Sequence, residues 1–134
     1  MKRLHIHIGV RDLAPSVRFY SALFGAPPTR HEADYARWML EDPRINFAIS
    51  TRAQAAGFDH LGLQVDSDDE LAELHARASA ADSTTLDEEG ATTCCYAHSV
   101  KHWVVDPQGI AWEHFMTTGE AKRYDDGNAC RTCG

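Results

Sequence analysis

The chain contains two imperfect copies of one pattern, and this internal repeat limits the fold more than any other feature of the sequence. Residues 5–10 (HIHIGV) align with residues 60–65 (HLGLQV) at an offset of 55. Residues 38–50 align with residues 103–115 at an offset of 65, and both of these segments carry an Asp-Pro pair. The two matches occur in the same order and divide the chain near residue 55. The sequence therefore predicts a duplicated structural unit.

Local patterns in the first copy predict a strand, a helix and three further strands. The alternation of apolar residues between Leu4 and Val10 is typical of a strand. A helix follows, with Asp12 near its cap, Pro15 in its first turn and Gly25 as its stop. The three strands are expected near residues 28–33, 35–41 and 44–51.

The second copy repeats this order. A strand over residues 58–66 precedes a helix over residues 68–81, and Ser67 with Glu70 forms a capping box at the helix start. A hairpin over residues 100–116 turns at its Asp-Pro pair. The repeated order predicts an α+β fold in which two tandem βαβββ modules form a curved mixed sheet around a cleft.

The length of 134 residues fits a single domain with one core. We expect this domain to cover residues 1–117, with modules at about 1–55 and 56–117. Residues 118–134 are then expected to form a flexible C-terminal tail that contains cysteines.

Composition narrows the classes of partner. The net charge is −7, with 20 acidic and 13 basic residues, which disfavours a nucleic-acid surface. The N-terminus lacks the apolar stretch of a signal peptide, and no window approaches the roughly 20 apolar residues of a membrane span. We therefore expect a cytoplasmic protein with reduced thiols that binds small molecules, with no nucleic acid or membrane as partner. A homodimer remains open.

The repeat converts sequence positions into a candidate metal site. His5 and His60 occupy equivalent places on the first strand of each module, so the pseudo-twofold axis brings them to opposite sides of one cleft. Glu113 lies on the last strand of the second module, and its counterpart in the first is Ala48. Two histidines and one carboxylate with open positions form the facial arrangement that suits non-haem Fe(II) and O₂. The cleft is therefore predicted to be a metal cleft.

Other assignments remain open around this site. His7 shares a face with His5 and could replace it as a ligand, although only His5 matches His60 in the repeat. His60 could instead be a histidine satisfied within the core. His7, Lys101 and His102 are candidates for groups that orient the ligands from outside.

Four cysteines add a second chemistry. The second half is ten residues longer than the first, 65 against 55, and Cys94 and Cys95 lie within the surplus. Adjacent thiolates are soft donors that select soft acceptors such as As(III) or Cd(II), although two incidental small residues in a loop are the alternative. Cys130 and Cys133 form a CxxC in the tail, either as an arm that captures a metalloid or as an end with no role.

These motifs together resemble a known superfamily. The segments HIHIGVRDLAPSVRFYSALFG, DHLGLQV and DPQGIAWEHF are similar to the vicinal oxygen chelate superfamily of glyoxalases, extradiol dioxygenases and bleomycin-resistance proteins, over about residues 3–117. In that superfamily the metal ligands lie on the first and last strands of the modules. The resemblance therefore implies His5, His60 and Glu113 as the ligands.

The cysteine motif narrows the resemblance to one branch. TCCYA, the following Lys101 and Trp103, and the cysteine-bearing tail look like the branch of organoarsenical carbon-arsenic lyases and cadmium-inducible proteins. This implies an Fe(II)-dependent dioxygenase in which Cys94 and Cys95 bind arsenic. Gln can stand in that branch where this chain has His5, a departure that bears on metal preference.

The expected reaction is cleavage of a trivalent organoarsenical, such as methylarsonous acid, with O₂ to give arsenite. Ni, Co, Zn or Cd could replace Fe(II) in a purified sample. One alternative is a stress protein that sequesters cadmium or arsenic without turnover. Another is a glyoxalase or extradiol-type metalloenzyme, for which the cysteines are unnecessary.

Overall fold

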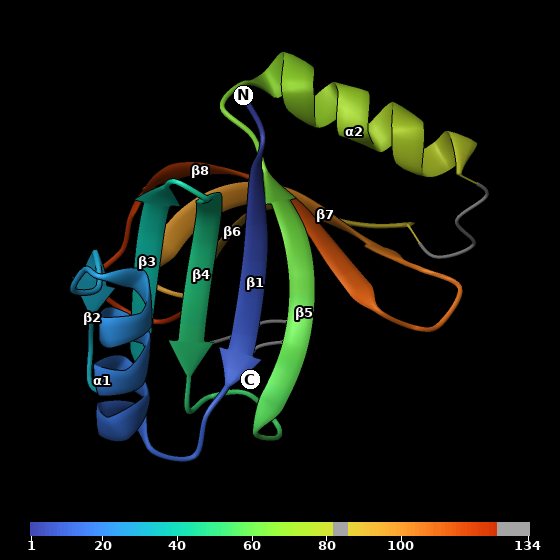
Figure 1. The fold of residues 1–134 in the computed structure, drawn as a ribbon. Coiled ribbons are helices and arrows are strands. Elements are labelled where there is room, and N and C mark those ends of the chain that lie inside the picture. The colour runs from blue at the N-terminus through green and yellow to red at the C-terminus, as the bar shows by residue number, and fades with distance from the viewer. Residues whose placement is uncertain (82–85, 126–134) are drawn as a thin grey trace.

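The computed structural model describes residues 1–81 and 86–125, and these form one strongly curved 8-stranded sheet with two helices on its outer side (Figure 1). The first module contains β1 (Arg3–Gly9), α1 (Leu13–Phe24), β2 (Arg30–His31), β3 (Tyr35–Glu41) and β4 (Arg44–Ser50). The second contains β5 (Gly57–Gln64), α2 (Asp68–Ala80), β6 (Leu86–Cys94), β7 (Ala97–Val105) and β8 (Ala111–Glu120).

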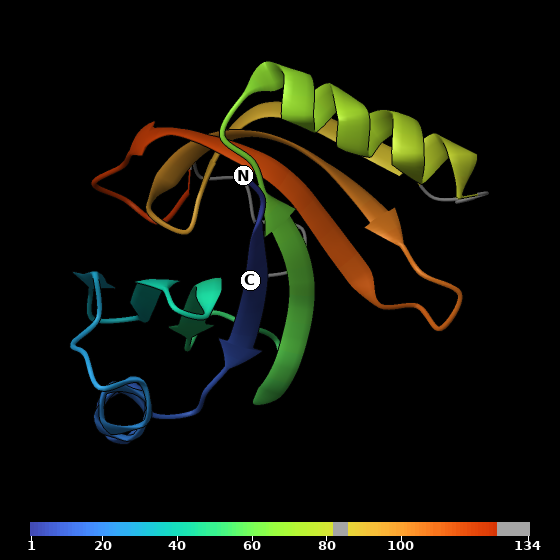
Figure 2. The ribbon, with the colours of Figure 1, turned by 45° about the horizontal axis from the view of Figure 1, so that its top comes forward.

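Strand order confirms the predicted duplication. The sheet runs β2-β3-β4-β1-β5-β8-β7-β6, so each module contributes four strands in the same relative order, reversed about the centre. The first strand of each module pairs in parallel with the last strand of that module, as β1 with β4 and β5 with β8. The modules join where β1 and β5 pair antiparallel. Figure 2 shows the result, a half-barrel whose two arms curl around a concave face.

Local signals set the ends of both helices as expected. Asp12 occupies the N-cap position of α1 in extended backbone without a side-chain capping hydrogen bond, and Gly25 ends the helix in the left-handed region at φ 69°. The Ser67 hydroxyl accepts a hydrogen bond from the Glu70 backbone N–H at the start of α2. These short-range interactions fix where each helix begins and ends.

The helices pack on the outer side of the sheet and leave its inner side to the polar residues. Under α1, a core cluster forms between the helix and strands β3 and β4; its buried members are Leu13, Ala36, Trp38, Phe47 and Ile49. α2 packs against β7 and β8. The concave face instead carries buried histidines and charged groups, which is where a site can form.

The structure refines the second module in two places. The surplus of this module lies largely in the strand β6, which ends at Cys94. The domain does not end at residue 117, because β8 continues to Glu120 and Tyr124 is buried. Residues 118–125 are therefore part of the packed structure. Cys130 and Cys133 lie outside the described residues.

Within residues 1–81 and 86–125, neither helix combines the length and apolar character that crossing a bilayer requires.

Candidate metal centre and cysteine pair

Three side chains from three strands converge on the concave face. His5 Nε2 and His60 Nε2 are 3.2 Å apart, and Glu113 Oε1 lies 3.5 Å from the first and 3.4 Å from the second. The three atoms therefore form a nearly equilateral triangle. Ligand bonds of about 2.1 Å separate neighbouring donors by roughly 3.0 to 3.4 Å, depending on the bond angle. The triangle has the size that one divalent ion needs.

Hydrogen bonds orient both imidazoles toward this point. The Nδ1–H of His5 donates to the Asn46 carbonyl oxygen at 3.1 Å, and that of His60 donates to Asp59 Oδ2 at 2.7 Å. Each bond places the ring proton on Nδ1 and turns the Nε2 lone pair inward. Two such lone pairs facing each other at 3.2 Å repel unless a cation or a proton lies between them. The donor set therefore fits a bound metal.

Glu113 is oriented in the same way by a cation. Lys101 Nζ donates to Glu113 Oε2, which leaves Oε1 directed at the two histidines. Burial by itself raises the pKa of Glu113, but the charge of Lys101, followed by His60 and His5, outweighs burial and holds the pKa well below its usual value. The carboxylate is thus ionised at neutral pH, as a ligand must be.

The two histidines titrate differently. Burial lowers the pKa of His5 to about 3, and the charge of Glu113 offsets only part of this effect. Burial also lowers the pKa of His60, but the hydrogen bonds to Asp59 and Glu113 outweigh it and raise the pKa to about 9. At neutral pH, His5 is therefore neutral, while His60 carries a proton that a metal ion would have to displace.

A glycine makes room for this arrangement. A Cβ added at Gly62 would lie 2.5 Å from the Glu113 carbonyl oxygen and 3.2 Å from Cδ2 of His5. Such contacts are too close for any side chain. Three residues of this arrangement were not predicted from the sequence: Gly62, Asn46 and Asp59. Two of them, Asp59 and Gly62, lie beside His60 in the segment Asp-His-Leu-Gly.

The cysteine pair occupies a tight hairpin turn. Cys94 ends β6 and pairs with Ala97 of β7, so Cys95 and Tyr96 are the two turn residues. Both have positive φ, 57° and 61°, as a type I′ hairpin turn requires. Non-glycine residues in this region cost about 1–2 kcal/mol each, and such strain is often found at functional sites. The turn brings Cys94 Sγ within 3.2 Å of Cys95 Sγ.

Contacts from distant parts of the chain hold this turn in place. The Tyr96 hydroxyl donates to Asp34 Oδ1 at 2.6 Å, and Cys95 Sγ lies 3.5 Å from the Tyr124 hydroxyl. Arg52 stacks on the Tyr124 ring at 4.2 Å. The turn of the second module is therefore anchored on the first. Cys94 is disulfide-bonded in this structure, whereas Cys95 carries a thiol.

One small cavity joins the cysteines to the metal donors. Its volume is about 30 Å³, which is close to that of one water molecule. Its lining includes Cys94, Cys95, His5, Lys101 and Glu113. The structure thus brings two of the three predicted metal ligands, His5 and Glu113, and both predicted arsenic ligands to one cavity.

The remaining candidates are placed differently. His7 is fully buried on the concave face, directly opposite His60 across the β1–β5 pairing. His102 lies elsewhere: its Nε2 is 2.9 Å from Nδ1 of His114, beside the ring of His75 on α2. Neighbouring residues of a strand face opposite sides, so His102 points outward where Lys101 points inward.

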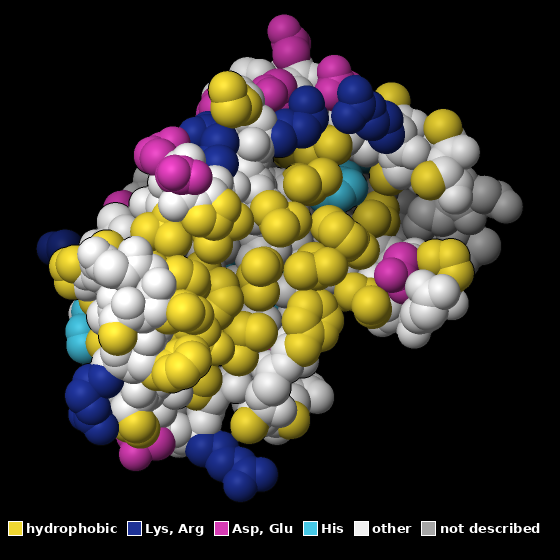
Figure 3. Space-filling model, viewed as in Figure 1, with side chains coloured by type: hydrophobic (Ala, Val, Ile, Leu, Met, Phe, Trp, Pro, Cys, Tyr) yellow, Lys and Arg dark blue, Asp and Glu magenta, His cyan; other side chains and the backbone are white. Residues whose placement is uncertain are grey.

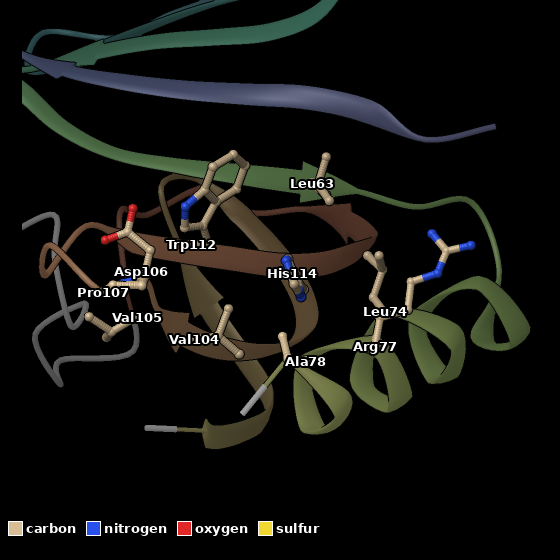
Figure 4. Close-up of a pocket in the computed structure, with 11 residues that line it drawn as sticks. Leu63, Leu74, Arg77, Ala78, Val104, Val105, Asp106, Pro107, Trp112 and His114 are labelled. Carbon is tan, nitrogen blue, oxygen red and sulfur yellow. The ribbon is translucent and has the colours of Figure 1, made fainter. Parts of the chain in front are cut away.

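A larger cavity lies on the outer side of the sheet, between α2 and strands β5, β7 and β8 (Figure 4). Its volume is about 630 Å³, and Leu63, Leu74 and Trp112 contribute to a mostly apolar lining. The sheet separates this cavity from the metal donors. It is therefore not part of the candidate centre.

Comparison with known proteins identifies the family. Residues 2–114 match the family described as Glyoxalase/Bleomycin resistance protein/Dioxygenase superfamily. A protein of Bacillus sp. strain MD1 named "Trivalent organoarsenical cleaving enzyme" is 40% identical over 119 residues, or 87% of this chain and 74% of that protein. "Cadmium-induced protein CadI" of Mycobacterium tuberculosis is 32% identical over 128 residues, or 95% of this chain and 84% of that protein.

A solved structure agrees at the level of the fold. The Mn(II)-bound glyoxalase from Novosphingobium aromaticivorans has a TM-score of 0.63 at 21% identity, and the match covers 98% of this chain and 44% of that one. The sequence relatives, the duplicated βαβββ sheet and this likeness agree. The chain belongs to the glyoxalase/bleomycin resistance protein/dioxygenase superfamily, in the branch that includes trivalent organoarsenical cleaving enzymes and CadI.

Proposed function

We propose that this protein is an Fe(II)-dependent dioxygenase that cleaves the carbon-arsenic bond of trivalent organoarsenicals and releases arsenite. The observation that carries the proposal is the shared cavity, which is lined by two adjacent cysteines and by groups of a two-histidine, one-carboxylate centre. The relative at 40% identity, named for organoarsenical cleavage, supports the same substrate class.

The cysteine pair is the proposed substrate site. Two thiols can replace the two hydroxyl groups of a trivalent organoarsenical, forming two arsenic-sulfur bonds and releasing two water molecules. A separation of 3.2 Å between the sulfur atoms suits binding to one atom, since two bonds of about 2.3 Å at a right angle span roughly 3.3 Å. Because Cys94 is disulfide-bonded here, its disulfide must first be reduced before both thiols can bind arsenic.

His5, His60 and Glu113 are the proposed ligands of Fe(II), which when bound supplies the binding and reduction of O₂. The protein's own part is to hold the reactants. Asn46 and Asp59 fix the imidazoles, and Lys101 keeps the carboxylate ionised and turned inward. Holding the organoarsenical beside the metal replaces a rare encounter by a fixed arrangement. Ni, Co, Zn or Cd could occupy the same ligands in a purified sample.

The overall reaction balances with O₂ as the sole oxidant. Methylarsonous acid and one O₂ contain together the atoms of one formaldehyde and one arsenous acid. The methyl carbon is oxidised by four electrons, O₂ is reduced by four, and arsenic stays trivalent. No external reductant is needed for this stoichiometry.

Sequestration without turnover is the second candidate, and the relationship to a protein named as cadmium-induced favours it. A sequestering protein would bind cadmium or arsenite at the cysteines and release nothing. A glyoxalase or extradiol-type enzyme is a further alternative, in which the cysteines would be dispensable.

The test is a single-turnover assay. The protein is fully reduced, loaded with Fe(II) without oxygen, mixed with methylarsonous acid and then exposed to O₂, and the arsenic species are separated. We expect arsenite from the wild type, and none from Cys95→Ser or Glu113→Gln. His31→Gln is the matched control, since His31 is an exposed histidine on β2 and should leave the yield unchanged. Arsenite from both site variants at the wild-type yield would contradict the proposal.

We also propose that two copies of the chain form a homodimer through the outer side of the β1–β5 junction. Three apolar pairs face outward there, Leu4 with Leu63, Ile6 with Leu61 and Ile8 with Phe58. The helices pack on strands to either side, and Figure 3 shows an apolar surface between them. The pseudo-twofold axis passes through this strip, so the strip can pack against the same strip of a second copy, as a symmetric dimer requires.

A further inference from the structure

His7 is a buried side chain on the concave face that the proposed site does not use. Its exposed fraction is 0%, and neither ring nitrogen has a hydrogen-bond partner within the described residues. An unsatisfied buried polar group is destabilising, so a native protein normally provides it with a partner. The partner of His7 is therefore to be sought in something that the concave face binds.

The position of His7 points to the metal centre. One of its nitrogens lies within 4.8 Å of a nitrogen of His5 and of His60. Its ring is 5.0 Å from that of His60, which is nearly the separation of 5.1 Å between the rings of His5 and His60. Three imidazoles gathered in this way can share one ion.

The pseudo-twofold symmetry explains why His7 lies there. In the second module, Glu113 of β8 is paired in parallel with Gly62 of β5, and the absence of a side chain at Gly62 makes room for the carboxylate. The equivalent pair in the first module is Ala48 of β4 with His7 of β1. In this pair the small residue, Ala48, is on the last strand and the histidine is on the first. Each pair therefore combines one small residue with one residue that can bind a metal, but the two strands have exchanged these residue types.

His7 thus fills the position in the first module that corresponds to Glu113 in the second. Without His7, that place would hold only the methyl group of Ala48, which is fully buried and binds nothing. We propose that His7 is a fourth protein ligand of the metal ion held by His5, His60 and Glu113. The inference rests on the proposed metal site and adds a ligand to it.

A fourth donor changes which ions the site prefers and how many positions stay open. A four-coordinate ion such as Zn(II) would have its positions closed by three imidazoles and a carboxylate, while a six-coordinate ion would keep two open. Two positions are enough when the organoarsenical is bound by the cysteines and not by the metal. The site would therefore hold its metal more tightly than a three-ligand site.

Cobalt substitution tests the proposal without measuring activity. Paramagnetic Co(II) shifts the N–H proton of each directly bound imidazole far outside the normal proton range. The Co(II)-loaded wild type should show three exchangeable shifted imidazole signals, and His7→Leu should show two. Two signals in the wild type would overturn the proposal, and this measurement does not depend on a variant that folds.

Metal affinity provides the second readout, by competition with a chelator. His7→Leu should weaken Co(II) binding by more than about 100-fold, because loss of an outer hydrogen-bond partner alone typically costs 10- to 100-fold. His31→Leu should bind as the wild type does. If His60→Leu loses the metal while His7→Leu retains full affinity, the site stands and the fourth ligand is wrong. If His60→Leu also retains full affinity, the proposed site itself fails.

Discussion

At the scale of single residues, the candidate centre depends on small groups placed beside its ligands. Gly62 leaves space for Glu113 and His5, and Asp59 fixes the proton of His60 on Nδ1. The sequence predicted His5, His60 and Glu113 as ligands because the repeat paired the two histidines and an acidic residue in an apolar strand required a partner. It missed Gly62 because close contact between strands cannot be read from one sequence.

Gly62→Ala should disrupt the centre. The new Cβ would lie 2.5 Å from the Glu113 carbonyl oxygen, which is backbone and can move only with β8. We expect a loss of about 1–3 kcal/mol in the free energy of unfolding, measured by denaturant titration, as for other overpacked sites. Gly119→Ala is the matched control, because its Cβ would meet no atom nearer than 3.8 Å. Equal stability of the two variants would contradict the packing argument.

Asp59→Asn should weaken metal binding while leaving the fold intact. The amide no longer stabilises the Nδ1–H of His60 with a negative charge, so the imidazole becomes a poorer and less fixed ligand. Chelator competition should show a loss of about 10- to 100-fold in affinity. Asp68→Asn, on the exposed start of α2, should show none. An unchanged affinity in Asp59→Asn would mean that His60 does not bind through Nε2.

At the scale of elements, the β6–β7 turn is the feature that the sequence predicted least well. The segment of β6, LDEEGATTC, lacks the apolar alternation of a half-buried strand, so the sequence set no bounds for this strand. The sequence also left the register of β7 open, and with it the side of the sheet on which His102 lies. The helices, by contrast, followed from their caps, because capping signals are local.

The anchor of this turn predicts a pH dependence. Burial raises the pKa of Asp34, but the hydrogen bonds from Tyr96 and Arg52 outweigh it and lower the pKa below the ordinary value of 3.8. A lowered pKa in the folded state means that Asp34 contributes stability above pH 3.8, and that this contribution is lost as pH falls through the folded-state pKa.

Asp34→Asn should therefore be less stable than the wild type at pH 6, and the difference should shrink as pH falls below 3.8. Thermal unfolding at a series of pH values measures it. Asp106→Asn is the control. Asp106 also accepts hydrogen bonds at a turn, from the Gln108 and Ile110 backbone N–H groups, but it takes no part in the contacts that anchor the Cys95–Tyr96 turn. A difference that grows toward low pH would have the opposite sign to the one expected here.

At the scale of the whole molecule, duplication accounts for both the site and the exposed strip. The repeat predicted the duplicated βαβββ modules and the cleft, and the structure adds that the modules join at their first strands. It did not predict which outer surfaces stay uncovered, since that depends on where each helix packs. The central strands carry apolar residues on the outside and metal donors on the inside.

The proposed homodimer would form through that uncovered strip. In the wild type, light scattering should give twice the chain mass of 14.9 kDa. Phe58→Glu should shift the protein toward the monomer, because a charge would be buried in an apolar contact. Phe58 is 52% exposed and Phe19 on α1 is 60% exposed, so Phe19→Glu is a control of equal chemistry outside the strip. A monomeric wild type would exclude the proposed pairing.

The central claim is that the metal centre and the cysteine pair act together on one substrate. The most direct measurement follows O₂ consumption and arsenite release simultaneously in the reduced, Fe(II)-loaded protein supplied with methylarsonous acid. We predict one O₂ consumed for each arsenite formed, and neither event in Cys95→Ser. Tight arsenic binding with no oxygen consumption, or oxygen consumption that is unchanged in Cys95→Ser, would contradict it.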